Sequence, residues 1–428
     1  MAINLHGDCK TRLKEQLAEA LCFAKVKNNS FLVTNSFGRV LSMESTLPSN
    51  RAQKDALDSY ISESPLFDFV VGYLSKEINE NQIFNLDMPE QNLNELPEYE
   101  DLDTVSDRLI ELFDTLPWKY CFTFNLNSQI TEYHREEITE ISESIKILRK
   151  GDELVSNFPL ESGIFGRDQF LHGRGLLGLG SKGEWNEDNL HVQVLVDGFM
   201  GKWVATSTEI TAIDSLKSFL GLLIATRVLT VEHSFSSSIV KSQFYVHQKY
   251  NNEWKIHDSG ELDDDISKTI SDLRIDDLNG YLVTDDDKTA HVKRNLRTIS
   301  KALGAADTSD KIRLAGQWFF DSYCGKNELL SYIQTTVSLE ILLGEKAVSD
   351  IIGLGELLRN RCAYLIGKSH SQREKVLSDF KKIYDIRSKI VHRGKSKLSN
   401  HERSLFSTLQ WIVSRVIQEE IKLIGESA

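Results

Sequence analysis

Apolar and polar positions follow a helical pattern in the last third of the chain. No proline follows Pro159, and helix interiors exclude proline because it lacks a backbone N–H. Glycines stand at the expected breaks between helices: Gly325, Gly344, Gly367 and Gly394. The candidate helices are 289–303, 308–322, 326–343, 348–367, 372–392 and 400–424. We therefore predict an all-α bundle for residues 289–428.

The preceding residues show a mixed pattern that predicts an α+β region. Helices are expected at 8–27 and 213–229. Strands are expected at 118–126, at 189–206 and within 238–258, and a hairpin at 30–43. Asn251-Asn252 is the expected turn of a second hairpin, within 238–258. The fold class is thus an α+β N-terminal region followed by an all-α C-terminal bundle.

The charge of the chain changes sign near residue 288. The net charge is −13, of which residues 289–428 contribute about +8 and residues 1–288 about −21. An acidic protein does not bind nucleic acid indiscriminately, because phosphate contacts are electrostatic, but a basic part can do so locally. We expect two regions: 1–288, acidic and regulatory or sensory, with room for two subdomains, and 289–428, basic and helical.

Cysteine usage and hydropathy predict a cytoplasmic protein without membrane association. The five cysteines are scattered and none has the close CxxC spacing of a zinc or redox site, so we expect reduced thiols. The N-terminus has no apolar segment of the kind found in signal peptides. The most apolar run, 219–229, is too short to span a bilayer and contains Arg227.

Three other patterns carry little functional weight. Residues 173–178 match GxGxxG but lack the strand before and the helix after that a dinucleotide site needs, so a flexible surface loop is favoured. The acid-rich stretches 86–107 and 258–288 predict surface loops. The aspartate triplets 263–265 and 285–287 in the second stretch are a weak metal signal, because adjacent side chains do not converge on one point.

The histidines of the predicted strands lack metal-ligand spacing. His191, His247 and His257 have no HExxH neighbour, and two of them alternate with apolar residues as solvent-facing positions do. We assign them no role. We expect no bound metal and no cofactor.

The segment Ile383–Gly394 has the sharpest chemical pattern. Leu377, Phe380, Tyr384 and Val391 fall at helical spacings and predict an apolar stripe. Arg387 falls on that stripe. A guanidinium on a buried face is costly unless it has a partner. The partner is expected to be a carboxylate in the core or an anion at a subunit interface.

His392 follows at the end of the same helix, where an imidazole can titrate near neutral pH. Basic residues surround it and would attract a polyanion such as RNA: Lys381, Lys382, Lys389, Arg393, Lys395 and Lys397. Arginine and histidine beside a basic rim suffice for RNA cleavage without metal. From these residues alone, an amphipathic helix with a basic end is the simpler interpretation.

The same residues carry a family resemblance over about 300–425. Residues 387–392 have the R-x4-H form of HEPN domains, and the segments 338–346, 356–367 and 382–394 resemble the Apea-like HEPN group. The resemblance implies a helical bundle that dimerises, so that two R-x4-H motifs form a metal-independent endoribonuclease site. It makes Arg387 and His392 the catalytic pair. Ser388 stands where many members have Asn, Asp or His, and Glu340 and Arg361 match polar positions of neighbouring helices as supporting residues.

Members with a similar layout are bacterial phage-defence proteins that damage RNA, in some cases tRNA, after infection. The resemblance therefore implies host or phage RNA as substrate, a phage-encoded trigger, and abortive infection as the outcome. From layout we expect 1–288 to sense the trigger or restrain the nuclease, and as a hypothesis its acids cover the basic rim. Two alternatives stay open: a non-catalytic HEPN module that binds RNA or a partner, and a metal-dependent nuclease centred on the acids of 258–288.

Overall fold

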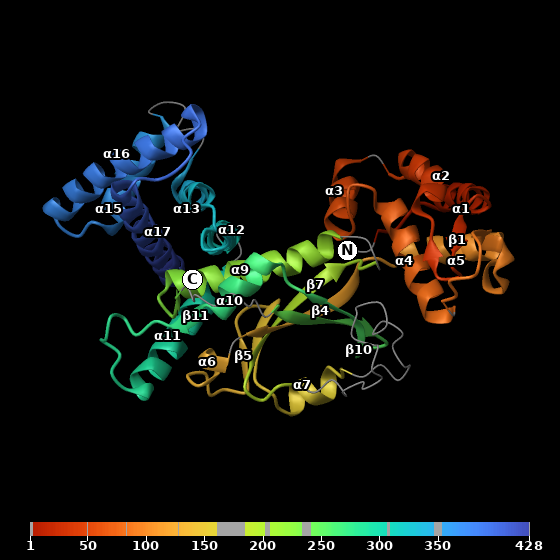
Figure 1. The fold of residues 1–428 in the computed structure, drawn as a ribbon, viewed down its shortest axis with the longest axis horizontal. Helices are drawn as coiled ribbons and strands as arrows, with labels where there is room; N and C mark the ends of the chain where they lie inside the picture. The colour runs from red at the N-terminus through yellow and green to blue at the C-terminus, as the bar shows by residue number, and fades with distance from the viewer. Residues whose placement is uncertain are drawn as a thin grey trace.

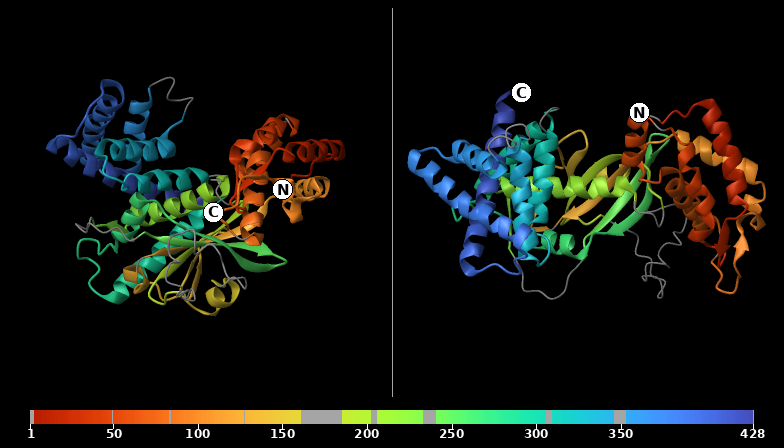
Figure 2. Two further views of the ribbon diagram at one scale, coloured as in Figure 1. Left: turned by 45° about the vertical axis from the view of Figure 1, so that its right-hand side comes forward. Right: turned by 90° about the horizontal axis from the view of Figure 1, so that it is seen from above.

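The computed structural model describes residues 3–48, 50–82, 84–126, 128–160, 185–201, 206–232, 241–305, 309–345 and 353–427. A helical N-terminal lobe and a set of C-terminal helices lie at opposite ends of the molecule, with an antiparallel sheet between them (Figures 1 and 2). The GxGxxG segment, 173–178, lies outside the described residues.

The N-terminal lobe, residues 3–116, combines five α-helices with a small sheet. Its helices are α1 (Gly7–Leu21), α2 (Gly38–Ser42), α3 (Arg51–Tyr60), α4 (Pro65–Asn81) and α5 (Leu102–Asp114). Its three short strands pair in the order β2 (Phe31–Leu32), β1 (Lys25–Lys27) and β3 (Gln91–Asn92). The helix predicted at 8–27 is confirmed but ends at Leu21, because the chain then turns into β1.

Two predictions for the lobe are wrong. The hairpin expected at 30–43 contains one short strand followed by helical turns, since Phe37 and Val40 are three residues apart and both enter the core. The acidic loop expected at 86–107 contains two 3-10 turns and the start of α5. There Leu93, Leu96 and Tyr99 are buried at a spacing of three, while the acids between them face solvent.

The central sheet has six antiparallel strands in the order β10-β9-β4-β7-β6-β5. Their bounds are β4 Trp118–Leu126, β5 Ile138–Glu140, β6 Ile145–Leu148, β7 Leu190–Gly198, β9 Gln243–Tyr250 and β10 Glu253–Glu261. The strand predicted at 118–126 is confirmed. The hairpin of β9 and β10 turns at Asn251-Asn252, whose φ values of 47° and 69° suit an asparagine turn.

The two faces of this sheet are both covered. The first face, with Phe122, Phe124 and Val194, packs under helix α9 (Ser207–Ala225). The second face, with Cys121, forms a cluster with Trp185 and with α7 (Asp152–Asn157).

The prediction that two strand histidines face solvent is wrong. His191 and His247 are fully buried on the second face of the sheet, packed against Trp185. Their ring nitrogens lie 2.8 Å from Asn125 Oδ1 and 2.9 Å from the Pro159 carbonyl oxygen, respectively. Burial lowers the pKa of each imidazole to about 4, so both are neutral at pH 7.

The stretch 258–288 is more ordered than the expected loop. It holds the end of β10, helix α10 (Asp264–Ser271) and strand β11 (Leu273–Ile275), which pairs with β8 (Leu229–Val231). The first aspartate triplet occupies the N-cap and first turn of α10, and the second occupies the first turn of α11 (Asp285–Leu303). Carboxylates are favoured there because helix N-termini carry unpaired N–H groups.

The helical C-terminal region that we predicted is confirmed. After α11 it contains α12 (Ser309–Asp321), α13 (Glu328–Leu343), α15 (Leu354–Ile366), α16 (His370–Arg393) and α17 (Asn400–Ser427). Gly394, at φ 61°, ends α16 in the left-handed conformation that glycine adopts without strain. Among the described residues, no helix is both long enough and apolar enough to cross a membrane.

The described core falls into one small and two larger clusters. One larger cluster lies within the N-terminal lobe and includes Phe199, the residue that follows β7. The other runs from β4 through α9 into α17, so the hydrophobic core is continuous across residue 288. The division of the chain into two regions at that residue stays a prediction.

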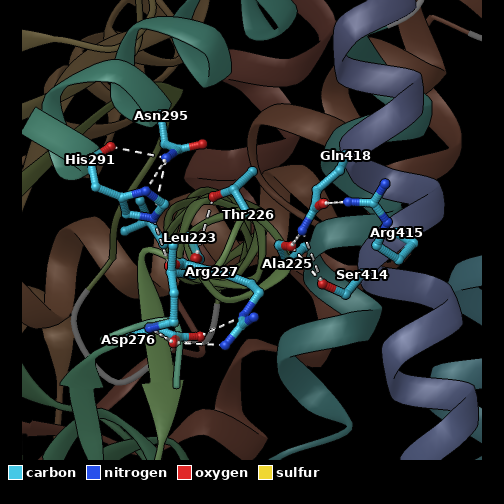
Figure 3. Close-up of polar contacts among 11 residues, drawn as sticks. Leu223, Ala225, Thr226, Arg227, Asp276, His291, Asn295, Ser414, Arg415 and Gln418 are labelled. Carbon is cyan, nitrogen blue, oxygen red and sulfur yellow. Dashed lines mark hydrogen bonds and ion pairs between the residues drawn. The ribbon is translucent and has the colours of Figure 1, made fainter. Parts of the chain in front are cut away.

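Helix α9 joins the sheet to the C-terminal helices. A Cβ placed on Gly221 would overlap the carbonyl oxygen of Gly316, so α9 and α12 approach at the level of the backbone. At the end of α9, the Ala225 carbonyl oxygen accepts hydrogen bonds from Ser414 Oγ (2.6 Å) and Gln418 Nε2 (2.7 Å) of α17 (Figure 3). These side chains satisfy a carbonyl that the helix end leaves unpaired.

Candidate functional site

The R-x4-H motif lies in the last two turns of α16. The buried face of this helix consists of Val376, Phe380, Ile383 and Ile386. The predicted apolar stripe is therefore displaced to the flank of that face: Tyr384 and Arg387 are half-buried, and Val391 is 48% exposed. The error arose because Phe380 belongs both to the predicted stripe and to the buried face. The residues of each set are spaced as on one side of a helix, so the spacing alone does not distinguish them.

Arg387 has a carboxylate partner inside the helical region. Its Nε lies 3.4 Å from Glu340 Oε1 of α13, with side-chain exposures of 23% and 18%. The Nε–H makes no well-aligned hydrogen bond, so the contact is an ion pair. Of the two partners expected for this guanidinium, the core carboxylate is the one present within a single copy.

Tyr384 completes this group, and we did not predict a polar role for it. Its hydroxyl donates a hydrogen bond of 3.3 Å to Glu340 Oε1, and its ring centroid lies 5.6 Å from the guanidinium carbon of Arg387. Burial, reinforced by the Glu340 charge, raises the pKa of Tyr384 to about 12, so the phenol keeps its proton at pH 7. The available sequence signal was its position three residues before Arg387, on the same side of a helix.

His392 is exposed in the last turn of α16. A separation of five residues rotates two helical positions by about 140° and moves them about 7.5 Å along the axis. Arg387 and His392 of one copy therefore do not converge on one side of the helix. Ser388 is half-buried directly after Arg387.

Arg361 of α15 lies at the end of α13. Its Nη1 donates a hydrogen bond of 2.8 Å to the Leu343 carbonyl oxygen, and its Nη2 pairs with Glu345. These contacts close the C-terminus of the helix that carries Glu340. The structure thus places Arg361 in an ion pair within the helical region and does not join it to Glu340.

The basic residues around His392 form a largely exposed rim at the end of α16. Lys381, Lys389, Arg393 and Lys397 are exposed. Lys382 is also exposed and lies 3.8 Å from Asp379, whereas Lys395 is half-buried and lies 3.0 Å from Glu402.

Glu402, the partner of Lys395, is held ionised. Burial acts to raise its pKa, but hydrogen bonds from Ser399 and Lys395 outweigh burial and hold the pKa at about 2. Lys395 therefore fixes the start of α17, and the exposed Lys381, Lys389, Arg393 and Lys397 are the side chains best placed to meet an anion.

The ion pairs described for the two aspartate triplets of 258–288 lie away from this rim. Among the described residues, no ion pair joins an aspartate of either triplet to Lys381, Lys382, Lys389, Arg393, Lys395 or Lys397. Asp286 instead lies 3.4 Å from Arg135, and Asp264 lies 3.5 Å from Lys241. The part of the chain that the structure describes also holds no group of three or more His, Cys, Asp or Glu placed to bind a metal ion.

Comparison of the chain with protein-family models, with curated proteins and with solved structures finds no match. The family resemblance of residues 300–425 thus rests on the motifs themselves, together with the placement of those motifs in a helical region.

Proposed function

We propose that the C-terminal helical region is a HEPN-like bundle and that the protein is a metal-independent endoribonuclease. The observation that carries this proposal is the position of Arg387. It is half-buried at the edge of the helices, and the described residues provide no hydrogen bond to either of its terminal nitrogens. An exposed His392 and basic side chains lie beyond it on the same helix.

The chemistry uses these two side chains on one phosphodiester. The imidazole of His392 takes the proton of the RNA 2′-hydroxyl, whose oxygen attacks the adjacent phosphorus. The guanidinium of Arg387 stabilises the charge that develops on the phosphorane oxygens. The bond to the 5′-oxygen then breaks and that oxygen takes the proton from the His392 imidazolium, which gives a 2′,3′-cyclic phosphate and a 5′-hydroxyl end.

A second copy of the chain completes the site in this proposal. Arg387 and His392 of one copy lie about 140° apart around α16, so one copy does not present both to a single phosphate. In a two-fold homodimer through the bundle, two R-x4-H motifs face each other across the seam. The exposed Val391, between the two catalytic positions, supplies apolar surface for such a seam.

We place this activity in anti-phage defence in the cytoplasm. Host or phage RNA, such as tRNA, is the proposed substrate, and a phage-encoded component is the proposed trigger. The first 288 residues restrain or activate the nuclease. Among the described residues, the ion pairs of the aspartate triplets go to Arg135 and Lys241, so they do not support restraint by direct charge cover within one copy.

The test is inducible expression in a bacterial host of the wild type beside His392→Ala. His401→Ala is the matched control, because His401 is also exposed but lies outside the motif. Growth arrest with new 5′-hydroxyl RNA ends, lost only in His392→Ala, is the expected result, and RNA cleavage by the purified protein should persist in EDTA. If the wild type is harmless, the same strains are challenged with phage. Equal toxicity of all three proteins would refute the assignment.

A non-catalytic module that binds RNA is the second candidate. The separation of Arg387 from His392 within one copy favours it if the chain stays monomeric. His392→Ala would then leave every phenotype unchanged, while Arg387→Ala would weaken RNA binding. Sedimentation of the purified protein separates the two candidates, because the nuclease requires a dimer.

A further inference from the structure

We infer that Tyr384 is a positioning residue for Arg387, holding its guanidinium through Glu340 so that the terminal nitrogens remain available to an RNA phosphate. This inference rests on the proposed function. It concerns a residue that touches neither the phosphate nor the reacting atoms, and it gives the carboxylate of Glu340 an orienting role.

One carboxylate oxygen serves both partners. Oε1 of Glu340 lies 3.4 Å from Arg387 Nε and accepts the hydrogen bond of 3.3 Å from the Tyr384 hydroxyl. Tyr384 and Arg387 are three residues apart on α16, so they meet Glu340 of α13 from one side of the helix. The hydroxyl fixes where the oxygen sits, and the oxygen fixes the Nε edge of the guanidinium.

The tyrosine ring is itself immobilised by packing. It stacks on Phe380 with ring centroids 6.1 Å apart and an interplanar angle of 15°. A Cβ added to Gly355 of α15 would also lie 2.8 Å from two atoms of this ring. Glycine at that position therefore provides the space that the ring occupies, and the ring has little freedom to move.

The guanidinium presents its remaining donors once Nε faces Glu340. Arginine has five N–H groups, of which four belong to the two terminal nitrogens in a planar fork. Such a fork matches two phosphate oxygens, so a preset orientation increases affinity by reducing the side-chain entropy lost on binding. The stacked ring beneath adds a cation–π attraction that favours the same orientation.

A second tyrosine–arginine pair in this region provides the comparison. Arg373 lies 5.3 Å from the ring centroid of Tyr364, but its Nε donates to the Gly367 carbonyl oxygen and no carboxylate is shared. Tyr364 is 73% exposed. Ring contact is thus common to both pairs, and among the described residues the shared carboxylate distinguishes Tyr384.

The experiment measures binding of a fluorescent 2′-O-methyl RNA 12-mer, which cannot be cleaved, across a series of salt concentrations. Each phosphate contact contributes about 0.7 to the slope of log K against log salt for a single strand. We expect Arg387→Ala to weaken binding about tenfold and to lower the slope by about 0.7. Tyr384→Leu should weaken binding about fivefold with a similar loss of slope, and Tyr384→Phe about threefold. Tyr364→Leu should bind as the wild type does.

The coupling through Glu340 is tested by combination. In a Glu340→Ala background, Tyr384→Phe should have no further effect, because its hydroxyl has lost the group through which it acts. A role of Tyr384 in packing alone would not change the salt slope. Where Tyr384→Leu fails to fold, Tyr384→Phe keeps the ring and carries the test.

Two results would overturn the inference. Wild-type affinity and slope in both Tyr384 variants, with weak binding by Arg387→Ala, would leave the proposed function standing and remove the role of Tyr384. Tighter binding by Glu340→Gln or Tyr384→Phe would mean that the carboxylate competes with RNA. Unchanged binding by Arg387→Ala is a separate result, because it would refute the phosphate contact on which the proposed function depends.

Discussion

The N-terminal lobe and the C-terminal helices join the same sheet in different ways. The lobe has its own hydrophobic cluster, into which Phe199, the residue after β7, inserts. The C-terminal helices share one cluster with the sheet through α9. The charge of the chain changes sign near residue 288, whereas the cores separate between residues 116 and 120. Net charge reports which partners a surface attracts, and the packing of apolar side chains decides which parts fold together.

The largest expected effect on stability comes from removing the ring of Phe199, which joins the lobe to the sheet. Phe199 is 1% exposed and lies 4.9 Å from Phe69 and 5.9 Å from Trp118 between ring centroids. Phe199→Ala should destabilise the lobe by about 4 kcal/mol through lost burial and a cavity. Hydrogen exchange should rise across residues 3–116, while α12 and α17 stay protected.

Phe84→Ala is the matched control for that variant. Phe84 belongs to the same lobe but is 48% exposed, so its loss should change stability by less than about 1 kcal/mol. Loss of protection in α12 or α17 upon Phe199→Ala would show that the lobe and the C-terminal helices form one cooperative unit.

The next test acts at the junction of α9 and α12. Gly221→Ala places a methyl group against the Gly316 carbonyl, which forces the two helices apart. We expect a loss of about 3 kcal/mol in stability, with exchange rising in both the sheet and the C-terminal helices. Gly38→Ala is the control, since a Cβ there meets nothing within 4 Å. Equal melting curves for the two variants would contradict the close approach of α9 to α12.

The smallest expected effect is a difference between the lobe and the sheet in how their stability depends on pH. Burial raises the pKa of Glu44 in the lobe to about 7, and the buried His191 and His247 of the sheet have a pKa of about 4. Between pH 7 and pH 5 the folded lobe binds more protons than its unfolded form, so acid stabilises it. The folded sheet binds fewer, so acid destabilises it.

Amide protection factors at pH 7 and pH 5 measure this contrast. We expect changes of about 1–2 kcal/mol in opposite directions, reduced in the lobe by the partial exposure of Glu44. Glu44→Gln should remove the dependence in the lobe and His247→Gln should reduce it in the sheet. Parallel changes in both parts of the wild type would show that these groups do not control the pH response.

Much of the helical region could be predicted because its signals are local. Proline-free amphipathic segments, separated by glycines, gave most helix boundaries within a few residues; α15 instead begins at Leu354, after the expected 348. The hairpin turn at Asn251-Asn252 was predictable for the same reason, since a turn depends on its own residues.

The candidate site was predictable only in part, because its geometry depends on distant residues. The R-x4-H spacing located Arg387 and His392, but the pairing of Arg387 with Glu340 joins positions 47 residues apart in the chain. The same limit explains the buried histidines. Alternation along β7 and β9 predicts two equivalent faces, and the packing of Trp185 and Phe158, which are distant in the chain, is what covers the second face.

Helix α9 is attached at both of its ends. At its start, Ser207 N–H donates to the Ile61 carbonyl oxygen (2.8 Å) and Thr208 Oγ1 donates to the Tyr60 carbonyl oxygen (3.0 Å), both in the lobe. At its end, the Ala225 carbonyl accepts from α17. One inserted residue would lengthen the helix by about 1.5 Å and rotate one end by about 100° relative to the other. Evolution can therefore change the side chains of α9 more freely than its length, and insertions in this protein should accumulate elsewhere.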